Sequence, residues 1–539
     1  MNNPSHDFIR RQNFSLALPD MIQNMFSRKI CSLPFASCLL PFASCQLKIL
    51  VITFTFTFTF TYSQSIKFSP TEISERGFDY AKVVGQDDDG VFVLLSNFPH
   101  QSTRDKVGFK VRKYKVAYYD FNLQRKWSVA VQPGPSQTID NIAFACGKVL
   151  IVYSREKESN HYEYYLQWIN NRGVPQGGNN KNFELTFQRG SDYGKAEVTA
   201  STDKERIVIM LHEITNNNHQ LFHCTTTDST LQFGKTKVID VPYKVDYFEA
   251  DEFDVSNNGD VALSGVFTPQ EKHNKNKLFD GDFWIYLLTA DKETADVHEF
   301  KLSDKTINEC SIAFDNLNNK LAVTGFYFDR EATIGSGVAY QLYDLKDGTR
   351  TEVFSRGFEP SKDEELKGAR NSDDGNGLMN YTINKIIMKA DGGAVVVAES
   401  FYTTEYSYFD YFTQSYYRRT EYHYGNILVI SIKNKGEIEF TKLVKKKQES
   451  IDDGGIYSSY LSMVSEKALY LFYNRDINSN NEIAGVSINA KGERTDKNVI
   501  RNVEHIWIMP DNGKQVSADE TIVPCIQKKK LVLAKISLQ

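Results

Sequence analysis

The densest group of side chains that could contact a ligand lies between Tyr402 and Tyr424, where ten aromatic residues accompany two adjacent arginines. Tyrosine offers rigid, amphipathic contact area, and tyrosine with arginine is the composition of binding hot spots. The same rings could stack on sugars. We therefore expect a protein or glycan ligand, with these candidate residues: Tyr406, Tyr408, Tyr411, Tyr416, Tyr417, Arg418 and Arg419. The alternative is that the segment forms two extended strands of an enlarged hairpin whose tyrosines pack on neighbours.

Two histidines and an acidic run have the residue types of a metal site but not its spacing. His219 and His223 would share one face of a helix, yet a strand rises about 3.3 Å per residue and sets them roughly 13 Å apart. The run Asp87–Gly90 lacks the closing glutamate of a calcium-binding loop, and runs of similar composition recur at the same place in other repeats. We therefore expect turns there and predict no metal.

A second acidic group alternates with phenylalanine and is a better ligand candidate, although the solvated side of a strand would look the same. Its members are Asp246, Glu249, Asp251, Glu252 and Asp254. The remaining motifs are near misses. Gly190–Lys195 has one residue too few between its glycines for a phosphate-binding loop, and Gly335–Gly337 lacks the spacing of a nucleophile elbow. The sequence assigns no catalytic residue and no cofactor.

The elements that must position these side chains come from one hairpin pattern, written about eight times between Phe78 and Gln539. Residues 83–95 read as an apolar run, a turn of Asp and Gly, and a second apolar run. A second hairpin follows in each unit, as at residues 427–444, so each unit has four strands, a to d. The first hairpins begin near Ala81, Ile142, Val198, Phe253, Ile312, Ile386, Leu461 and Gln515.

Four-stranded antiparallel units repeated radially predict an all-β fold, a β-propeller with eight blades preferred over seven. The last unit ends at Leu531–Leu538 without its d strand, and the apolar stretch Ser65–Phe68 could supply it. Such pairing of the two ends would close the ring and leave no long free edge. The alternative is two β-sandwich domains, but no linker rich in Pro, Gly or Ser divides the chain.

In a propeller the long connections of this chain would gather on one face. The b to c and d to a connections share a face because strands alternate in direction, and the tight a to b and c to d turns lie on the other. Insertions that gather on one face of a repeat fold mark its binding face. We expect the ligand on this loop face, chiefly at the longest b to c connection, residues 402–424. The other long connections are residues 98–111, 269–282, 329–337 and 359–380.

The first 63 residues differ in composition from the repeats and predict an export signal with low-complexity sequence. An apolar stretch and the Thr/Phe alternation of residues 53–61 follow basic residues, and Thr61 and Ser63 fit a cleavage site ahead of Gln64. A β-strand is the alternative for the alternation, and lipidation at Cys45 is an alternative fate. We expect residues 64–539 to form a single propeller domain, secreted, periplasmic or on the cell surface, without a membrane span.

Charge and cysteine usage narrow the function classes. A net charge of −5 provides no basic field, so we expect no nucleic-acid partner. The short runs Lys445–Lys447 and Lys528–Lys530 are interpreted as solvated faces or edge protection. The absence of a CxxC pair excludes a zinc ribbon or redox motif. Disulfide bonds are an alternative for the four cysteines of the repeats, which are Cys146, Cys224, Cys310 and Cys525.

From Gln64 onward the strand pattern resembles WD40-like and kelch-like propellers, and the segment ending at Ser63 resembles export signals of Bacteroidota. The Gly-His and Trp-Asp signatures and the kelch double glycine are absent, and the tryptophans occupy no common position in the repeats. The resemblance therefore implies a secreted bacterial β-propeller and carries over no catalytic residue. We predict an exported, non-catalytic binding or assembly module. The alternative is an extracellular hydrolase of glycans or peptides with carboxylates on the loop face.

Overall fold

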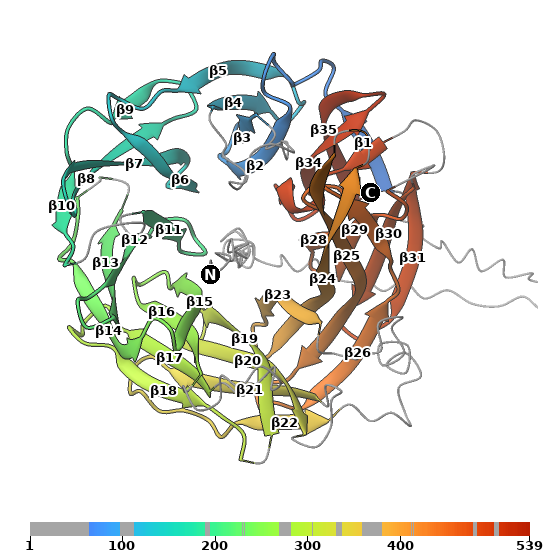
Figure 1. Cartoon of the computed structure of the whole chain (residues 1–539). Helices are drawn as coiled ribbons and strands as arrows, with labels where there is room; N and C mark the ends of the chain where they lie inside the picture. The colour runs from blue at the N-terminus through green and yellow to red at the C-terminus, as the bar shows by residue number, and fades with distance from the viewer. Residues whose placement is uncertain are drawn as a thin grey trace, which may run out of the picture.

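The computed structural model describes residues 64–97, 113–188, 195–228, 230, 232–268, 282–303, 305–329, 337–357, 380–410, 412, 414–477, 482–500 and 506–538. Regular structure in these residues is β-strand, with one 3-10 turn, η3 (Pro510–Asn512). The strands form eight separate antiparallel sheets, which we call blades one to eight. Figure 1 shows the blades arranged around a common centre.

The strand bounds follow the predicted units. Blades one and two contain β2 (Tyr80–Gln86), β3 (Gly90–Ser96), β4 (Tyr114–Asp120), β5 (Arg125–Val131), then β6 (Thr138–Ala145), β7 (Lys148–Glu158), β8 (His161–Ile169), β9 (Pro175–Gly177) and β10 (Phe183–Thr186). Blades three and four contain β11 (Ala196–Ala200), β12 (Ile207–Ile214), β13 (His219–Thr227), β14 (Lys237–Lys244), then β15 (Phe248–Val255), β16 (Val261–Phe267), β17 (Asp282–Leu288) and β18 (Asp296–Phe300).

Blades five and six contain β19 (Lys305–Asp315), β20 (Lys320–Asp329), β21 (Gly337–Asp344), β22 (Phe354–Gly357), then β23 (Tyr381–Met388), β24 (Ala394–Asp410), β25 (Ser415–Ile432), β26 (Ile438–Val444) and β27 (Gln448–Ile451). Blades seven and eight contain β28 (Leu461–Val464), β29 (Ala468–Asn474), β30 (Ile483–Asn489), β31 (Arg494–Ile500), then β32 (Ile506–Ile508), β33 (Lys514–Gln515), β34 (Glu520–Gln527), β35 (Lys530–Leu538) and β1 (Gln64–Phe68). Eight blades, and not seven, are present.

The predicted ring closure is confirmed. The strand β1 pairs antiparallel with β35, from Gln64 opposite Leu538 to Phe68 opposite Ala534. It is the outermost strand of blade eight and supplies the missing fourth position. Because both ends of the described chain share one sheet, neither β1 nor β35 needs a cap of its own.

Hydrophobic clusters fill the space between successive blades. Blade five contributes Ala322 and Tyr340 to a cluster that blade six completes with Ile383 and Val396. The same arrangement joins blade eight to blade one, where residues of β34 and β35 pack against residues of β2, β3 and β4. Each buried Val, Leu or Ile side chain contributes roughly 1.5–3 kcal/mol to folding. The alternative of two β-sandwich domains is wrong, because every blade packs on a neighbour at both sides.

Polar side chains connect the innermost strands of neighbouring blades. Asp140 of blade two accepts a hydrogen bond from the Ala196 backbone N–H of blade three at 3.0 Å. Glu309 of blade five accepts one from the Ile383 N–H of blade six at 3.1 Å. Acids on these strands thus satisfy backbone donors at sheet edges that no further strand covers. These carboxylates therefore have a structural role.

Candidate functional site

Residues 401–424, which we call the aromatic arm, are strand and not loop at 401–410 and 415–424. The second strand of blade six, β24, continues to Asp410, and β25 returns from Ser415, with Phe401 opposite Tyr424 and Phe409 opposite Tyr416. The prediction that this b to c connection is a loop is therefore wrong. The backbone forms the enlarged hairpin that was the alternative. Thr, Tyr and Phe favour strands, so β24 and β25 continue as strands beyond the part of blade six that packs in the ring.

The pairing register distributes the candidate residues over both faces of the arm. Residues directly opposite each other in an antiparallel pair share a face. Tyr406 is opposite Arg419 and Tyr408 is opposite Tyr417, so these four lie on one face. The other face carries Tyr416 and Arg418, which are opposite Phe409 and Ser407. Tyr411 lies outside the described residues.

The rings of the arm contact each other and leave much of their surface exposed. Tyr408 and Tyr417 are stacked with 5.8 Å between ring centroids, and the Arg419 guanidinium lies 5.2 Å from the Tyr408 centroid. Tyr406 and Tyr408 are 38% and 37% exposed, and Tyr416 is 78% exposed. The predicted packing of tyrosines on neighbouring elements therefore does not apply to these rings. They pack across their own hairpin and present an aromatic surface to the solvent.

The two arginines of the arm are already paired within blade six. Arg418 forms an ion pair with Glu405 across the hairpin. Arg419 lies 3.7 Å from a carboxylate oxygen of Asp452. These contacts fix the direction of both guanidinium groups, and they leave the arm with little net charge. Recognition by the arm therefore depends on its aromatic rings more than on its arginines.

The two outer edges of the arm differ. On the β25 edge, β27 pairs with residues 421–424, and Asp452 ends this pairing by hydrogen bonds in both directions with the Thr420 backbone, at 2.9 and 3.0 Å. On the β24 edge, β23 pairs only as far as Ser400. Among the described residues no strand covers Thr403–Tyr408 on that side. An uncovered strand edge is a template for a strand from another chain.

A buried ion pair lies at the base of the arm. The Glu399 carboxylate on β24 and the Lys446 ammonium are 2.6 Å apart, with side chains 1% and 0% exposed. Lys446 also donates to Gln448 at 2.7 Å, and the Ser459 hydroxyl donates to Glu399 at 2.7 Å. The interpretation of Lys445–Lys447 as a solvated face is wrong for its middle residue. Lys446 turns inward because a buried carboxylate requires a partner charge.

The Asp511 carboxyl adjoins this pair. Asp511 lies on η3, the turn that interrupts the innermost strand of blade eight between β32 and β33. Burial by surrounding atoms and the negative charge of Glu399 raise the pKa of Asp511 to about 7, against the opposing effects of Ser459, Lys82 and Lys446. Sequence reasoning did not select these groups. The one available signal was a glutamate that ends the apolar run Ala394–Ala398 of a central strand.

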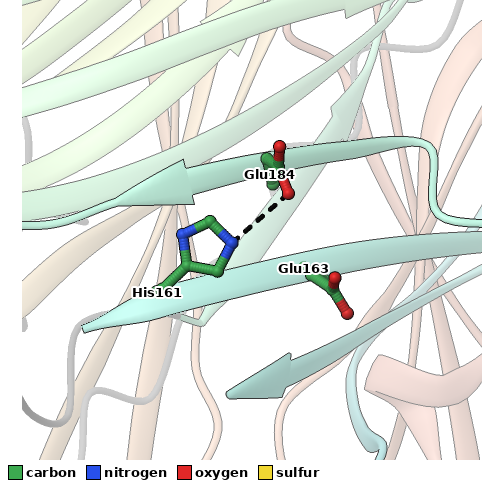
Figure 2. A group of neighbouring side chains, drawn as sticks. All are labelled: His161, Glu163 and Glu184. Carbon is green, nitrogen blue, oxygen red and sulfur yellow. Dashed lines mark hydrogen bonds and ion pairs between the residues drawn. The ribbon is translucent and has the colours of Figure 1, made fainter. Parts of the chain in front are cut away.

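Figure 2 shows His161 and Glu163 on β8 with Glu184 on β10, whose ligand atoms lie within 4.8 Å of one another. It is the one group of this kind in the described part of the chain. Arg155 donates to Glu163 at 3.0 Å, and Lys181 donates to Glu184 at 2.5 Å. Hydrogen bonds from Arg155 and the Tyr165 hydroxyl lower the pKa of Glu163 to about 2. Since cations already compensate both carboxylates, the group fits a salt-bridge network and not a resident metal.

The histidine pair and the acidic group of the sequence analysis also make structural contacts. His219 and His223 lie on β13 as the strand spacing predicts, and the His223 ring lies 2.6 Å from Glu213. In the acidic group of blade four, Glu252 accepts from the Ile312 N–H at 2.7 Å and Asp254 from the Phe314 N–H at 3.3 Å. The interpretation of the acidic group as a ligand site is therefore wrong for Glu252 and Asp254, which instead join blade four to blade five.

The four repeat cysteines are free thiols, and Cys224, Cys310 and Cys525 are buried. The open alternative of disulfides among them is thus excluded in this structure. Burial raises the pKa of the Cys224 thiol to about 12, which leaves it without thiolate character near neutral pH. These residues act as small hydrophobic side chains in the blades.

Comparison with known proteins assigns no family. No family model matches the chain, and no curated protein matches it. No helix in the described residues has the length and apolar character to cross a membrane.

Solved structures with some similarity include the WD40 domain of SCAP from fission yeast, at 10% identity and TM-score 0.36, covering 88% of this chain and 98% of that one. Prolyl oligopeptidase B from Galerina marginata has 11% identity and TM-score 0.37, covering 83% of this chain and 55% of that one. A protein of unknown function from Dyadobacter fermentans has 9% identity and TM-score 0.30, covering 66% and 97%. At these values nothing about function transfers, and the β-propeller architecture follows from the strand pairing of the chain itself.

Proposed function

We propose that residues 64–539 form one exported, non-catalytic binding module that holds a protein partner through the aromatic arm. The observation that carries the proposal is the exposure of aromatic rings on both faces of a hairpin that has one uncovered edge. A glycan would stack on one face only. A protein that surrounds the arm, or adds a strand to the β24 edge, would use both faces and the backbone donors and acceptors of Thr403–Tyr408.

Binding is favoured over the alternative, hydrolysis, by the state of the loop-face carboxylates. Hydrolysis of a glycosidic bond by the usual route needs two carboxyl groups that both reach the substrate. At the base of the arm the Glu399 carboxylate is 1% exposed and bound to Lys446, so it does not supply a second free carboxyl beside Asp511. Export is supported by the composition of residues 1–63, with cleavage expected ahead of Gln64.

The test compares the 64–539 protein with a triple variant, Tyr406→Ser, Tyr408→Ser and Tyr416→Ser, on arrays of extended peptides and of glycans. We expect the parent protein to retain a subset of peptides and the triple variant to lose them, because hot-spot aromatics contribute about 2 kcal/mol or more each. Phe354→Ser is the matched control, since Phe354 of blade five is 39% exposed and lies outside the arm.

Four results would contradict the proposal. Retention of glycans alone would assign a glycan ligand, and equal retention by parent and triple variant would remove the arm from the binding site. Turnover of a labelled peptide or glycan by the parent protein would favour the hydrolase. A melting temperature several degrees lower in the triple variant, with binding intact, would show that the tyrosines are packing residues.

A further inference from the structure

A pocket of about 300 Å³ lies between blades three and four, which pack side by side in Figure 1. We call it the basic pocket and define it by Arg206, Lys235, Lys237, Val261 and Leu288. These residues lie in or next to the a to b and c to d connections of the two blades, so the pocket is on the face opposite the b to c hairpin of the aromatic arm. Its volume, at the lower end of the usual range, suits a small molecule.

The floor of the basic pocket is apolar. Val261 begins β16 and Leu288 ends β17; the two residues are opposite each other in the register, and both are 2% exposed. Cys224 of β13, also 2% exposed, contributes a third apolar side chain to the lining. A fully hydrated ion gains nothing from such a surface, whereas an apolar group is stabilised there by leaving water. The floor therefore favours a ligand that has an apolar body.

Hydrogen bonds within and between the two blades hold the walls of the basic pocket. The Lys237 ammonium of blade three donates to the main-chain carbonyls of Ala290 and Lys292 in blade four, at 2.7 and 2.6 Å. Within blade three, the Gly234 N–H donates to the Thr226 carbonyl at 2.9 Å. Gly234, Thr226 and Ala290 all line the pocket. The pocket is therefore formed before a ligand arrives, and binding does not have to order its walls.

The charged residues of the basic pocket are all cationic, and no acidic residue is part of its lining. The Lys237 ammonium donates to carbonyls and forms no ion pair with a carboxylate in the described part of the chain. Asp291, the acid nearest in charge to Lys237, accepts a hydrogen bond from the Thr289 hydroxyl at 2.7 Å. A cleft lined by one sign of charge raises the local concentration of ions of the opposite sign. The pocket therefore favours an anion.

Arg206 is the cation of the basic pocket with hydrogen-bond donors to offer. Its side chain is exposed, and its guanidinium forms no ion pair with any described carboxylate. Asp228, on which the charge of Arg206 acts, instead accepts hydrogen bonds from the N–H and the hydroxyl of Thr230 at 2.8 and 2.6 Å. Lys235, in contrast, is paired with Glu293 at 2.6 Å. A guanidinium presents a planar fork of N–H donors that matches the oxygens of a carboxylate or a phosphate.

We propose that the basic pocket binds a small organic anion, whose carboxylate or phosphate group accepts hydrogen bonds from Arg206 and whose apolar body covers Val261 and Leu288. Lys237 contributes its positive charge from the wall, while its hydrogens stay on the carbonyls of blade four. No bond is made or broken. The basic pocket is separate from the aromatic arm, and the proposal does not depend on the partner proposed for the arm.

The test titrates the 64–539 protein, which contains every strand of the ring, with benzoate and with phenyl phosphate by calorimetry and saturation-transfer NMR. We expect a dissociation constant on the order of 1 mM for at least one of them, and the tighter of the two identifies the preferred oxyanion. Arg206→Gln should weaken that anion about tenfold, because hydrogen bonds to a charged group are lost. Arg172→Gln is the matched control, since Arg172 is exposed in a turn of blade two, outside the basic pocket, and binding should stay unchanged.

Two further arms test the role of charge. Glu293→Gln frees Lys235 from its carboxylate and should tighten binding of the anion about two- to threefold. Benzyl alcohol and benzylamine, which have the same ring without a negative charge, should bind at least about tenfold more weakly than the anion.

Three results would overturn the proposal. They are binding of benzyl alcohol or benzylamine as tight as that of the anion, binding of the anion unchanged in Arg206→Gln or weakened in Glu293→Gln, and no saturable signal from either anion up to about 50 mM. The triple arm variant should bind the anion as the parent does, so failure of the arm and failure of the basic pocket are distinguishable.

Discussion

At the scale of single residues, the most consequential contact is the ion pair between Glu399 and Lys446. Both side chains are buried; Gln448 accepts a hydrogen bond from Lys446, and the Ser459 hydroxyl donates one to Glu399. Desolvation of two charges is expensive, so such a pair adds little net stability while intact. Removal of one partner leaves the other charge buried and uncompensated.

We therefore expect Lys446→Met to lower the free energy of unfolding by about 3–5 kcal/mol, measured by urea denaturation. The double variant Glu399→Leu with Lys446→Met should recover part of this loss, because it leaves no isolated charge. The control is Lys433→Met, since its ion pair with Glu437 is exposed, and it should unfold as the parent does. A loss in the double variant as large as the sum of both single losses would refute this account of the pair.

The Asp511 carboxyl gives a pH-dependent prediction. Its pKa is raised to about 7 in the folded protein, against an ordinary value of 3.8. Between these pH values the folded chain holds more protons than the unfolded chain, so the free energy of unfolding falls as the pH rises from about 4 to 7. Glu399, Lys446 and Lys82 are the charged groups that face it.

Asp511→Asn should remove this part of the pH dependence. We expect its melting temperature, relative to the parent, to increase between pH 4.5 and pH 8, as measured by calorimetry. Asp140 and Asp254, whose pKa values are raised to about 6 by burial, act with the same sign in both proteins and cancel in the difference. A difference that stays constant or decreases across this range would show that Asp511 titrates normally.

At the scale of elements, the aromatic arm is an extension that the propeller does not need. Its outer residues contact each other across the hairpin, and the core clusters on either side of blade six take only Tyr381, Ile383 and other residues below the arm. The packing that stabilises blade six therefore ends near Ser400. Beyond it, the arm is held by its own strand pairing and by β27.

Removing residues 405–420 tests this view. Thr404 and Glu421 are opposite each other in the register, so an Asn-Gly turn can join them as a two-residue hairpin. We expect the shortened protein to melt within about 2 °C of the parent, because Thr420 is the one buried side chain among the described residues that are lost, while partner binding disappears. Circular dichroism and array binding measure the two effects. A melting temperature lower by many degrees would mean that the arm supports the blade.

At the scale of the whole molecule, closure of the ring decides the stability of its two ends. The strand β1 contributes five paired residues to β35, and Ile66 and Phe68 pack against the cluster between blades seven and eight. Without β1, the strand β35 would have an uncovered edge and part of this cluster would face the solvent. Both changes favour unfolding and edge-to-edge association.

A protein that begins at Ser69 instead of Gln64 should therefore melt at lower temperature and aggregate earlier on heating, as followed by calorimetry and light scattering. Lys67→Ala is the control, because Lys67 is exposed and its removal leaves the strand intact. Identical melting of the two lengths would show that β1 is dispensable and that the inter-blade clusters alone hold the ring.

The architecture was predictable because its signals are local. The hairpin of β2 and β3 is visible as two apolar runs around the turn Asp87–Gly90, and the same pattern gave all eight blades and the strand at Ser65–Phe68 that closes the ring. Alternation and turn chemistry act between residues close in the chain. For the same reason, the segment Tyr402–Tyr424 was identified as aromatic and unusual from its composition.

Tertiary structure decided what the sequence left open about that segment and about the buried ion pair at its base. Aromatic residues on both faces of the arm conceal the alternation that identifies a strand, so only the pairing of β24 with β25 shows which rings share a face. Lys446 appeared solvated because its neighbours in the chain are lysines, and its true partner, Glu399, is on another strand. The raised pKa of Asp511 likewise depends on burial and on Glu399, a residue of another blade.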